Sequence, residues 1–583
     1  MVHSLYELAQ ADSYHVFAGS ALLGVLFHVS IQFVEFEKFM FHFLAALLVM
    51  SIAVSTAFSI FGQVAWHQAI VKTVIIEVIF NSSCLFSIGI YRLLLHRCRR
   101  FPGPFGAKLS RFWTAYIFSK NAQYYKELEK MQAKYGDFVR TGPREITVFR
   151  ATAVSAIYGP ASRLLKSTWF GQSGNDPDKC SLHMVRDALK HRNRRRAWDR
   201  GFSIKALAKY QPRIKAKSDL LKERIQDRAG QPIDITKWAM FYSFDVVGEV
   251  AFGKDFANLV TGIEHSAIKP IHEHIRVFGV LSPLPWLMNI LTCIPSASSI
   301  YTEIFSFCAN EIQAKQKVSY QFVALAPVAR FFITDVRFIP KSWDNEEYPN
   351  DIVSWLLKAV FEKDASAAPT KEALDYDSRL VLLAGSDTTS STLANTLFYL
   401  CKNVATQKKL REKLQQAHSG GARQWDYEKV QLVTYLDDII AETLRLRPAV
   451  LVAGSRETQA TGLQIDEVHI PGNTNVLVSV YSIQRDPRYW SRANEFIPER
   501  WGDRRSEMGT DKAPYLPFLA GAYSCPGKNF AYMSLRIALS ILVQNFDISF
   551  SPGENGYSFE NNALDCFVIT LPPLHLNFTP LVL

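Results

Sequence analysis

The stretch PFLAGAYSCPGKNFAYMSLR, from Pro517 to Arg536, brings one cysteine, Cys525, from a glycine-containing loop to the start of an apolar helix. Gly521 allows backbone conformations that residues with a Cβ avoid, so the loop can fold tightly and approach a flat group. Pro526 lies where a helix tolerates a missing N–H, and apolar residues recur at helical spacing from Phe530 to Leu542. The helix dipole and the free N–H groups of a first turn favour a thiolate. An anionic sulfur placed in this way is a metal ligand or a nucleophile, and the ordinary alternative is a buried structural cysteine.

The composition predicts a large catalytic domain with added segments. The chain has 583 residues, of which 48% are hydrophobic, enough to bury a sizeable core. Its net charge of +11 is compatible with a nucleic acid, an anionic membrane or an acidic protein partner. Its eight cysteines are scattered without CxxC pairs. This pattern argues against a disulfide framework or a zinc site and suits a domain that faces the cytosol.

The first hundred residues are predicted to anchor the chain in a membrane. Three apolar runs, Val16–Val34, Phe39–Val71 and Thr73–Leu95, have about bilayer length or more. A cleaved signal peptide is disfavoured because Met1–His15 contains no Lys or Arg. The basic run His96–Arg100 predicts that the third span ends in the cytosol. We therefore expect three transmembrane helices and a lumenal N-terminus; the alternative is one or two spans with an interfacial helix.

Beyond the anchor, FPGPFG at residues 101–106 predicts a rigid hinge that precedes a catalytic domain over residues 107–583. Lys120–Tyr135 has the pattern of an amphipathic helix. Phe138–Phe149 alternates as two strands would around a Gly-Pro turn.

Two helical stretches carry unusual polar residues. In the basic stretch Asp187–Ser203, His191 and Arg195 fall on one helix face, whereas a solvated face or a nucleic-acid patch is the alternative. In Arg379–Leu400, the run AGSDTTSST sets small and polar residues inside a long apolar helix. Buried polar groups are costly unless they are used, although a close crossing with another backbone would also explain small residues here.

A third helix, Tyr435–Val450, is predicted to end at Pro448. Glu442 and Arg445 lie three residues apart on one face of it. Ion pairs with this spacing are common on protein surfaces, so the pair by itself indicates little.

Taken together, these motifs resemble the cytochrome P450 family of haem-thiolate monooxygenases. Phe518, Gly521, Cys525 and Gly527 match its Phe-x-x-Gly-x-x-x-Cys-x-Gly loop. The other matching motifs follow in the family's order, from the hinge to the C-terminus: His191 with Arg195, Asp387 with Thr388, Glu442 with Arg445, Arg456, and Arg500. One departure is Tyr523, where the family usually has an Arg that binds a haem propionate.

The resemblance implies a mainly α fold with a small β-rich lobe and a role for each motif. Cys525 would be the axial ligand of the iron of haem b. His191, Arg195 and Arg456 would bind haem propionates, with Arg192, Arg194 and Arg196 free to meet an acidic redox partner. Thr388 would take part in oxygen activation, and Asp387 would relay protons from solvent. Glu442, Arg445 and Arg500 would form a buried network that holds the cysteine loop, and Gln484, where many members have His, is expected to matter little.

The implied function is hydroxylation or epoxidation of a hydrophobic small molecule with O₂ and electrons from NADPH-cytochrome P450 reductase. The residues before Cys525, the basic helix and the triple membrane segment resemble fungal microsomal members, which implies a secondary metabolite as substrate. The catalytic domain would face the cytosol from the endoplasmic reticulum membrane, and no nucleic acid is expected as a partner. The alternatives are a haem-thiolate isomerase or dehydratase that needs no reductase, and a non-catalytic membrane transporter or sensor. Asp387 and Thr388 argue against the isomerase.

An insert at residues 318–341 matches nothing in the resemblance. It is apolar, whereas loops at such positions are usually short and polar. One interpretation is an additional loop that touches the membrane near the pocket. The other is a retained intron, because Val318-Ser319 can be encoded GTAAGT and a Lys341 codon can end in AG. Transcripts that uniformly include the segment would contradict the intron hypothesis.

Overall fold

The structure, a computed structural model, describes residues 12–172, 176, 178–269, 277, 279–291, 293–294, 306–315, 350–418 and 425–581. The insert at residues 318–341 and the chain before Asp12 lie outside the described residues. The described part is mainly helical with small sheets, which confirms the predicted fold class.

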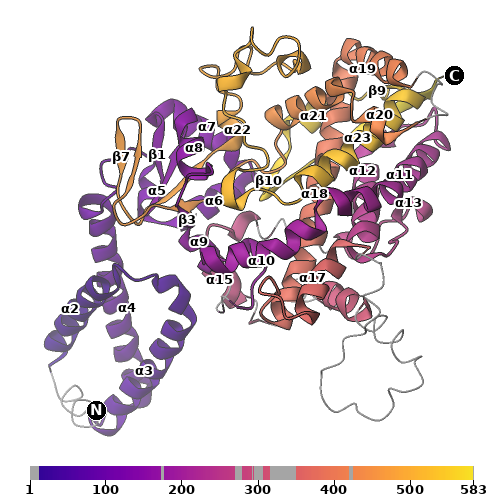
Figure 1. Cartoon of the computed structure of the whole chain (residues 1–583). Coiled ribbons are helices and arrows are strands. Elements are labelled where there is room, and N and C mark those ends of the chain that lie inside the picture. Colours follow the sequence, from indigo (N-terminus) through magenta and orange to yellow (C-terminus); the bar gives the residue numbers. More distant parts are fainter. Residues whose placement is uncertain are drawn as a thin grey trace, which may run out of the picture.

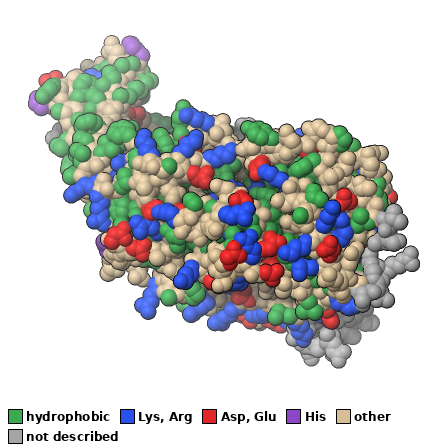
Figure 2. Space-filling model, turned by 90° about the horizontal axis from the view of Figure 1, so that it is seen from above, with side chains coloured by type: hydrophobic (Ala, Val, Ile, Leu, Met, Phe, Trp, Pro, Cys, Tyr) green, Lys and Arg blue, Asp and Glu red, His purple; other side chains and the backbone are tan. Residues whose placement is uncertain are grey.

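Three N-terminal helices stand at one end of the molecule (Figure 1). They are α2 (Ser13–Ile31), α3 (Met40–Ile60) and α4 (Trp66–Ile90), extended by η1 (Phe36–Phe39) and η2 (Tyr91–Leu95). All three are long and apolar enough to cross a membrane. Figure 2 shows hydrophobic side chains dominating this lobe, whereas acidic and basic side chains are interspersed over the rest of that face.

The boundary between the second and third helices differs from the predicted one. The turn falls at residues 61–65 instead of near Lys72, which lies inside α4 with its ammonium 5.2 Å from the ring centre of Phe58. An apolar run without charges gave no signal for this turn.

The hinge packs directly against the β-rich lobe. The Arg140 amide donates to the carbonyl of Pro102 at 2.7 Å. A Cβ built on Gly103 would lie 2.3 Å from the Arg140 carbonyl oxygen, so only glycine fits here. The predicted strands around the Gly-Pro turn are present as β1 (Phe138–Gly142) and β2 (Glu145–Val148).

The largest sheet of the described residues has the strand order β1-β2-β8-β5-β3. Its strands β2 and β8 are parallel, and its other pairs are antiparallel. The additional strands of this sheet are β3 (Leu165–Lys166), β5 (Arg456–Glu457) and β8 (Asn475–Val478). The smaller sheets contain β4 (Ile233–Asp234), β6 (Leu463–Ile465), β7 (Val468–Ile470), β9 (Phe546–Phe550), β10 (Leu564–Cys566), β11 (Val568–Thr570) and β12 (His575–Pro580).

The helical body surrounds one long helix, α18, which packs against α12, α21 and α23 around the main hydrophobic core (Figure 1). Its larger helices are α10 (Ala188–Gly201), α11 (Ile204–Gln226), α12 (Ile235–Val247), α17 (Ile352–Phe361), α18 (Lys371–Lys402), α19 (Val404–Ala417), α21 (Thr434–Leu446) and α23 (Lys528–Asn545). Shorter helices are α5 (Phe105–Leu109), α6 (Arg111–Asn121), α7 (Tyr124–Tyr135), α8 (Ala151–Tyr158), α9 (Thr168–Gln172), α13 (Asn258–Thr261), α15 (Pro285–Leu291), α20 (Tyr427–Val430), α22 (Val480–Ile483) and α24 (Tyr557–Asn561). The amphipathic helix predicted from Lys120 is thus divided between α6 and α7, because Ala122 adopts a left-handed conformation.

Candidate functional site

A cavity of about 410 Å³ lies between α10, α18, the loop before α23 and the β-rich lobe. Most of the predicted site residues line it: His191, Arg195, Asp387, Thr388, Arg456, Phe518, Tyr523, Cys525 and Gly527. Cys525 is exposed, and because it lines the cavity and burial raises the pKa of its thiol, its accessible surface belongs to this interior space.

The cysteine loop ends at α23, which begins later than predicted. Gly527 is the N-cap and Lys528 the first helical residue, so Cys525 and Pro526 precede the helix. The Cys525 amide donates to the carbonyl of Phe518 at 2.9 Å, which closes the loop. Burial raises the thiol pKa above its ordinary value, and the backbone N–H of Gly527 and the charge of Arg195 lower it by less. The N–H groups at the helix start therefore lower the thiol pKa, as predicted. In the protein without a bound group, however, desolvation raises this pKa by more.

Gly521 serves packing and does not line the cavity. Its φ of +63° lies in the left-handed region. A Cβ built there would lie 2.7 Å from the carbonyl oxygen of Tyr158, at the end of α8. The glycine thus allows the loop to pack against the protein's own backbone.

Cationic and imidazole side chains surround the ring of Tyr523. The Arg456 guanidinium lies 4.7 Å and the Lys166 ammonium 5.0 Å from the ring centre. The imidazole of His191 lies 4.7 Å away, centre to centre. Burial, together with Lys166, lowers the pKa of His191 to about 2, so His191 is a neutral donor or acceptor here. Lys166 also lines the cavity and was not predicted as a site residue.

The two cations, Lys166 and Arg456, are buried. Lys166 and Arg456 are only 3% and 2% exposed. The Lys166 ammonium donates to the carbonyls of Leu182 and His183, at 3.2 and 2.7 Å. Within the described part of the chain, the hydrogen-bond acceptors of both cations are backbone carbonyls, and neither has a carboxylate within ion-pair distance. Because buried charges are costly without a partner, the site fits an anionic group placed beside the thiol.

Arg195 and Arg194 have different roles, although both belong to α10. Arg195 donates to the carbonyl of Ser524 at 2.7 Å and pairs with Asp199 at 2.7 Å, so it links α10 to the cysteine loop. Arg194 is buried in a 2.7 Å ion pair with Asp377 of α18. The expectation that Arg194 is free to meet a redox partner is therefore wrong, whereas Arg192 is exposed.

Thr388 and Asp387 project from the middle of α18. The Thr388 hydroxyl donates to the carbonyl of Ala384 at 2.6 Å and lines the main cavity. Asp387 is buried and lines both this cavity and a second one of about 270 Å³. Helix packing explains Gly385, because a Cβ there would lie 2.9 Å from Val247 of α12. The helix is unbroken from Lys371 to Lys402.

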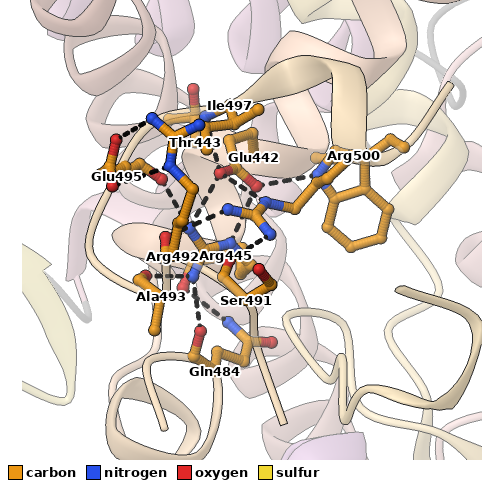
Figure 3. A network of polar contacts seen from close by, with 12 residues as sticks. Glu442, Thr443, Arg445, Gln484, Ser491, Arg492, Ala493, Glu495, Ile497 and Arg500 are labelled. Atoms are coloured by element: carbon orange, nitrogen blue, oxygen red, sulfur yellow. Dashed lines mark hydrogen bonds and ion pairs between the residues drawn. The ribbon is translucent and has the colours of Figure 1, made fainter. Parts of the chain in front are cut away.

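Glu442, Arg445 and Arg500 form a fully buried charge network (Figure 3). One carboxylate oxygen of Glu442 accepts from Arg445 and Arg500, at 2.8 and 2.9 Å. The other accepts from Arg445 at 2.8 Å and from the indole N–H of Trp501 at 3.0 Å. The remaining guanidinium donors reach the carbonyls of Gln484, Ser491, Arg492, Ala493 and Glu495. This network joins α21 to the chain that leads into the cysteine loop.

Gln484, which is expected to matter little, extends the network to the segment that enters the cysteine loop. Its amide nitrogen donates to the carbonyls of Leu444 and Arg445, at 3.0 and 3.1 Å. Its amide oxygen accepts from the backbone N–H of Leu516 at 2.7 Å. The sequence shows only a neutral polar side chain between two buried helical segments. Such a residue does not reveal which groups it will bond to in the fold.

Comparisons with known proteins identify the family of this chain. A family model described as Cytochrome P450 matches residues 102–578. Cytochrome P450 monooxygenase orf5 of Eupenicillium brefeldianum is 35% identical over 493 residues, 85% of this chain and 93% of that protein. Cytochrome P450 monooxygenase FCK2 of Fusarium pseudograminearum is 32% identical over 587 residues, 99% of each chain. Tryprostatin B 6-hydroxylase of Aspergillus fumigatus is 29% identical over 485 residues, 83% of this chain and 81% of that protein. This chain belongs to the cytochrome P450 family and is a monooxygenase, an oxidoreductase that incorporates oxygen.

Proposed function

We propose that this protein is a membrane-anchored haem-thiolate monooxygenase in which Cys525 is the axial ligand of haem b. The family implies a cysteine-ligated haem. The observation that supports Cys525 is its position on the wall of a cavity that also carries Thr388 and two buried cations, for which the described residues offer no carboxylate. The donor set fits haem, because a sulfur that can bind the iron lies beside cations that can bind the two propionate carboxylates of haem.

The surrounding residues would hold and orient this group. Arg456 and Arg195 would bind the carboxylates through charged N–H donors, and His191 would add a neutral one. Phe518 and Gly527 frame the sulfur; a Cβ at Gly527 would lie 3.9 Å from it. The Glu442–Arg445–Arg500 network would keep the loop fixed. When bound, haem supplies the O₂ and electron-transfer chemistry that inserts one oxygen atom into a C–H or C=C bond.

Asp387 and Thr388 would deliver protons to the reaction. Asp387 lies on the wall between the two cavities, and the second cavity is also lined by Lys237 and Glu264, which are exposed. Water in this second cavity would let Asp387 exchange protons with solvent. Thr388 would then hold the proton at its hydroxyl, facing the main cavity. This pair favours the monooxygenase over an isomerase or dehydratase that needs no proton supply.

The substrate would be a hydrophobic small molecule, and electrons would come from NADPH-cytochrome P450 reductase. The substrate side of the cavity is apolar, with Leu383, Ala384 and Val450 on its wall. Exposed Arg192 and Arg196 would meet an acidic surface of the reductase. The relatives are fungal, and one is named for hydroxylation of tryprostatin B. We therefore propose a fungal secondary metabolite as substrate and the endoplasmic reticulum membrane as location, with the catalytic domain in the cytosol.

The decisive experiment is the CO-difference spectrum of dithionite-reduced membranes that contain the full chain. We expect a thiolate-type band for the native protein and its loss in Cys525→Ala and Cys525→His, whatever haem stays bound. Cys180→Ala is the control, because that cysteine does not line the cavity. A Cys525 variant that keeps the band would end the assignment. NADPH turnover with added reductase then separates the monooxygenase from an isomerase, and the absence of any haem band would favour a transporter or sensor.

A further inference from the structure

Lys166 is a buried cation beside the predicted carboxylate end of the cofactor site. It belongs to β3, which pairs with β5 so that Lys166 lies directly opposite Arg456. Both side chains line the cavity and both lie over the ring of Tyr523. The strand pair therefore presents two cations side by side, from positions that are 290 residues apart in the sequence.

Among the described residues, the ammonium of Lys166 has partners for two of its donors and one donor left. An ammonium carries three N–H groups, and the carbonyls of Leu182 and His183 accept from two of them. Burial and the charge of Arg456 hold the pKa of Lys166 well below its ordinary value, which shows how unfavourable the site is for this cation without an anion. A carboxylate at the third donor would reverse that balance.

Tyr523 cannot supply this charge itself. Burial raises the pKa of its phenol, so it stays neutral and offers a single O–H donor. Its ring instead forms the platform against which the two cations lie. An arginine at position 523 would place its charge in the space next to the Lys166 ammonium, because that ammonium lies 5.0 Å from the centre of the Tyr523 ring.

We propose that Lys166 binds a carboxylate of the cofactor and supplies the positive charge that Tyr523 does not. The proposal rests on the haem site proposed above. It makes Lys166 and Arg456 a pair of carboxylate-binding residues that one strand pair positions.

The test uses the purified full-length holoenzyme in detergent, with two readouts besides activity. One is the rate of haem transfer to excess apomyoglobin, and the other is the midpoint reduction potential. Lys166→Met keeps the length of the side chain and removes its charge. We expect haem loss about tenfold faster or more, because a hydrogen bond to a charged group is lost, and a lower potential, because the reduced state carries one more negative charge. Lys166→Arg should retain near-native values.

Two further variants separate binding from structure. Tyr523→Arg in the Lys166→Met background should restore haem retention and raise the potential, although it cannot replace the bonds to Leu182 and His183. Lys217→Met is the control, since that lysine is also buried but pairs with Glu249 and Asp255 away from the cavity. Haem loss at the native rate in Lys166→Met, or no rescue by Tyr523→Arg, would overturn the proposal. A native enzyme without a thiolate-type CO band would instead overturn the haem site itself.

Discussion

At the scale of single residues, the hydroxyl of Thr388 is tied to its own helix and still faces the cavity. Thr388→Ala removes little volume, so we expect haem binding to survive. Protons would then arrive without control, and NADPH oxidation would yield peroxide or water; the fraction of electrons found in product should fall roughly tenfold or more. Thr396→Ala is a matched control, because Thr396 makes the same bond to the carbonyl four residues earlier and does not line the cavity. Equal coupling in Thr388→Ala and the native enzyme would assign Thr388 a purely structural role.

Asp565, another single residue, predicts how stability depends on pH. It is buried on β10, and burial raises its pKa to about 7 from an ordinary value of 3.8. The unfolded chain therefore loses this proton at lower pH than the folded protein does, so stability falls as the pH rises from about 4 to about 7. The full effect is a few kcal/mol, on the order of 1.4 per pKa unit.

Asp565→Asn should remove most of that loss. The asparagine oxygen can still accept the backbone N–H of Phe567, which bonds Asp565 in the tight turn between β10 and β11. We expect a higher Tm than the native protein above pH 7 and a gain that shrinks toward pH 4, as measured by thermal unfolding of the holoenzyme. Asp547→Asn, at an exposed site on β9, should leave the pH profile unchanged. A gain in Asp565→Asn that is constant with pH would mean that the charge is not its cause.

At the scale of elements, Gln484 connects α21 to the chain segment that enters the cysteine loop. Gln484→Met keeps the shape and removes three hydrogen bonds, so we expect a loss of about 2–4 kcal/mol in unfolding free energy and faster haem loss. Gln407→Met is the control: Gln407 is equally buried, donates to Leu400 and Ile548 and accepts from Ile548 and from the guanidinium of Arg411, but lies away from the loop. It should lower Tm without changing haem loss. If both variants lose haem equally fast, the effect of Gln484 is general stability alone.

The elements also show how far the sequence alone could lead. The β1–β2 hairpin and the end of α21 were predictable, because alternation, a Gly-Pro turn and Pro448 are local signals. The inward face of α10 was not, because it carries His191 and the charged Arg194 beside the apolar Ala197 and Trp198. Arg194 is buried only because α18 brings Asp377 to it.

The residues of the candidate site also divide into those that local sequence motifs predict and those that only the tertiary fold brings to the site. The thiol, the α18 pair and the charged network belong to motifs that are contiguous or closely spaced. Lys166 could not be found in this way, because β3 has two residues and its place depends on pairing with β5. Gln484 was missed for the same reason: its bonds join segments that only the tertiary fold brings together.

At the scale of the whole molecule, the three N-terminal helices contact the rest of the protein at an identifiable point. Glu35, between α2 and α3, accepts from Arg186 at 3.2 and 3.1 Å, and Arg186 also pairs with Glu457 at 2.9 Å. Arg186 further donates to the carbonyl of Lys166 at 3.2 Å, so the contact reaches the strand pair at the cavity. The pair is about one-fifth exposed on each side. A contact of this kind contributes about 1 kcal/mol or less, too little to hold the domain together.

We therefore expect a chain that begins near Arg100 to bind haem and give the thiolate-type CO band. Glu35→Gln in the full chain should do the same, which separates the loss of this ion pair from the loss of the spans. Haem failing to incorporate in the truncated chain but not in Glu35→Gln would mean that the three helices help to build the domain. Failure in both would assign that role to the ion pair.

The truncated chain should nevertheless stay on membranes, because an apolar surface adjoins the hinge. Phe105, Phe112 and Tyr116 of α5 and α6 are each more than half exposed. Burying three such rings in the lipid interface is worth several kcal/mol, at about 25 cal/mol per Å² of apolar surface. We expect the chain from Arg100 to sediment with phosphatidylcholine vesicles, and its triple variant Phe105→Ser, Phe112→Ser, Tyr116→Ser to remain in solution with its haem band intact. The control replaces Ile204, Leu432 and Tyr557, which are more exposed than the hinge residues but distant from them in the sequence, with serine. Since these residues lie elsewhere in the fold, their replacement should not change sedimentation. If both triple variants dissociate from the vesicles to the same extent, the attachment is unspecific. The hinge surface would then not determine how the domain rests on the membrane.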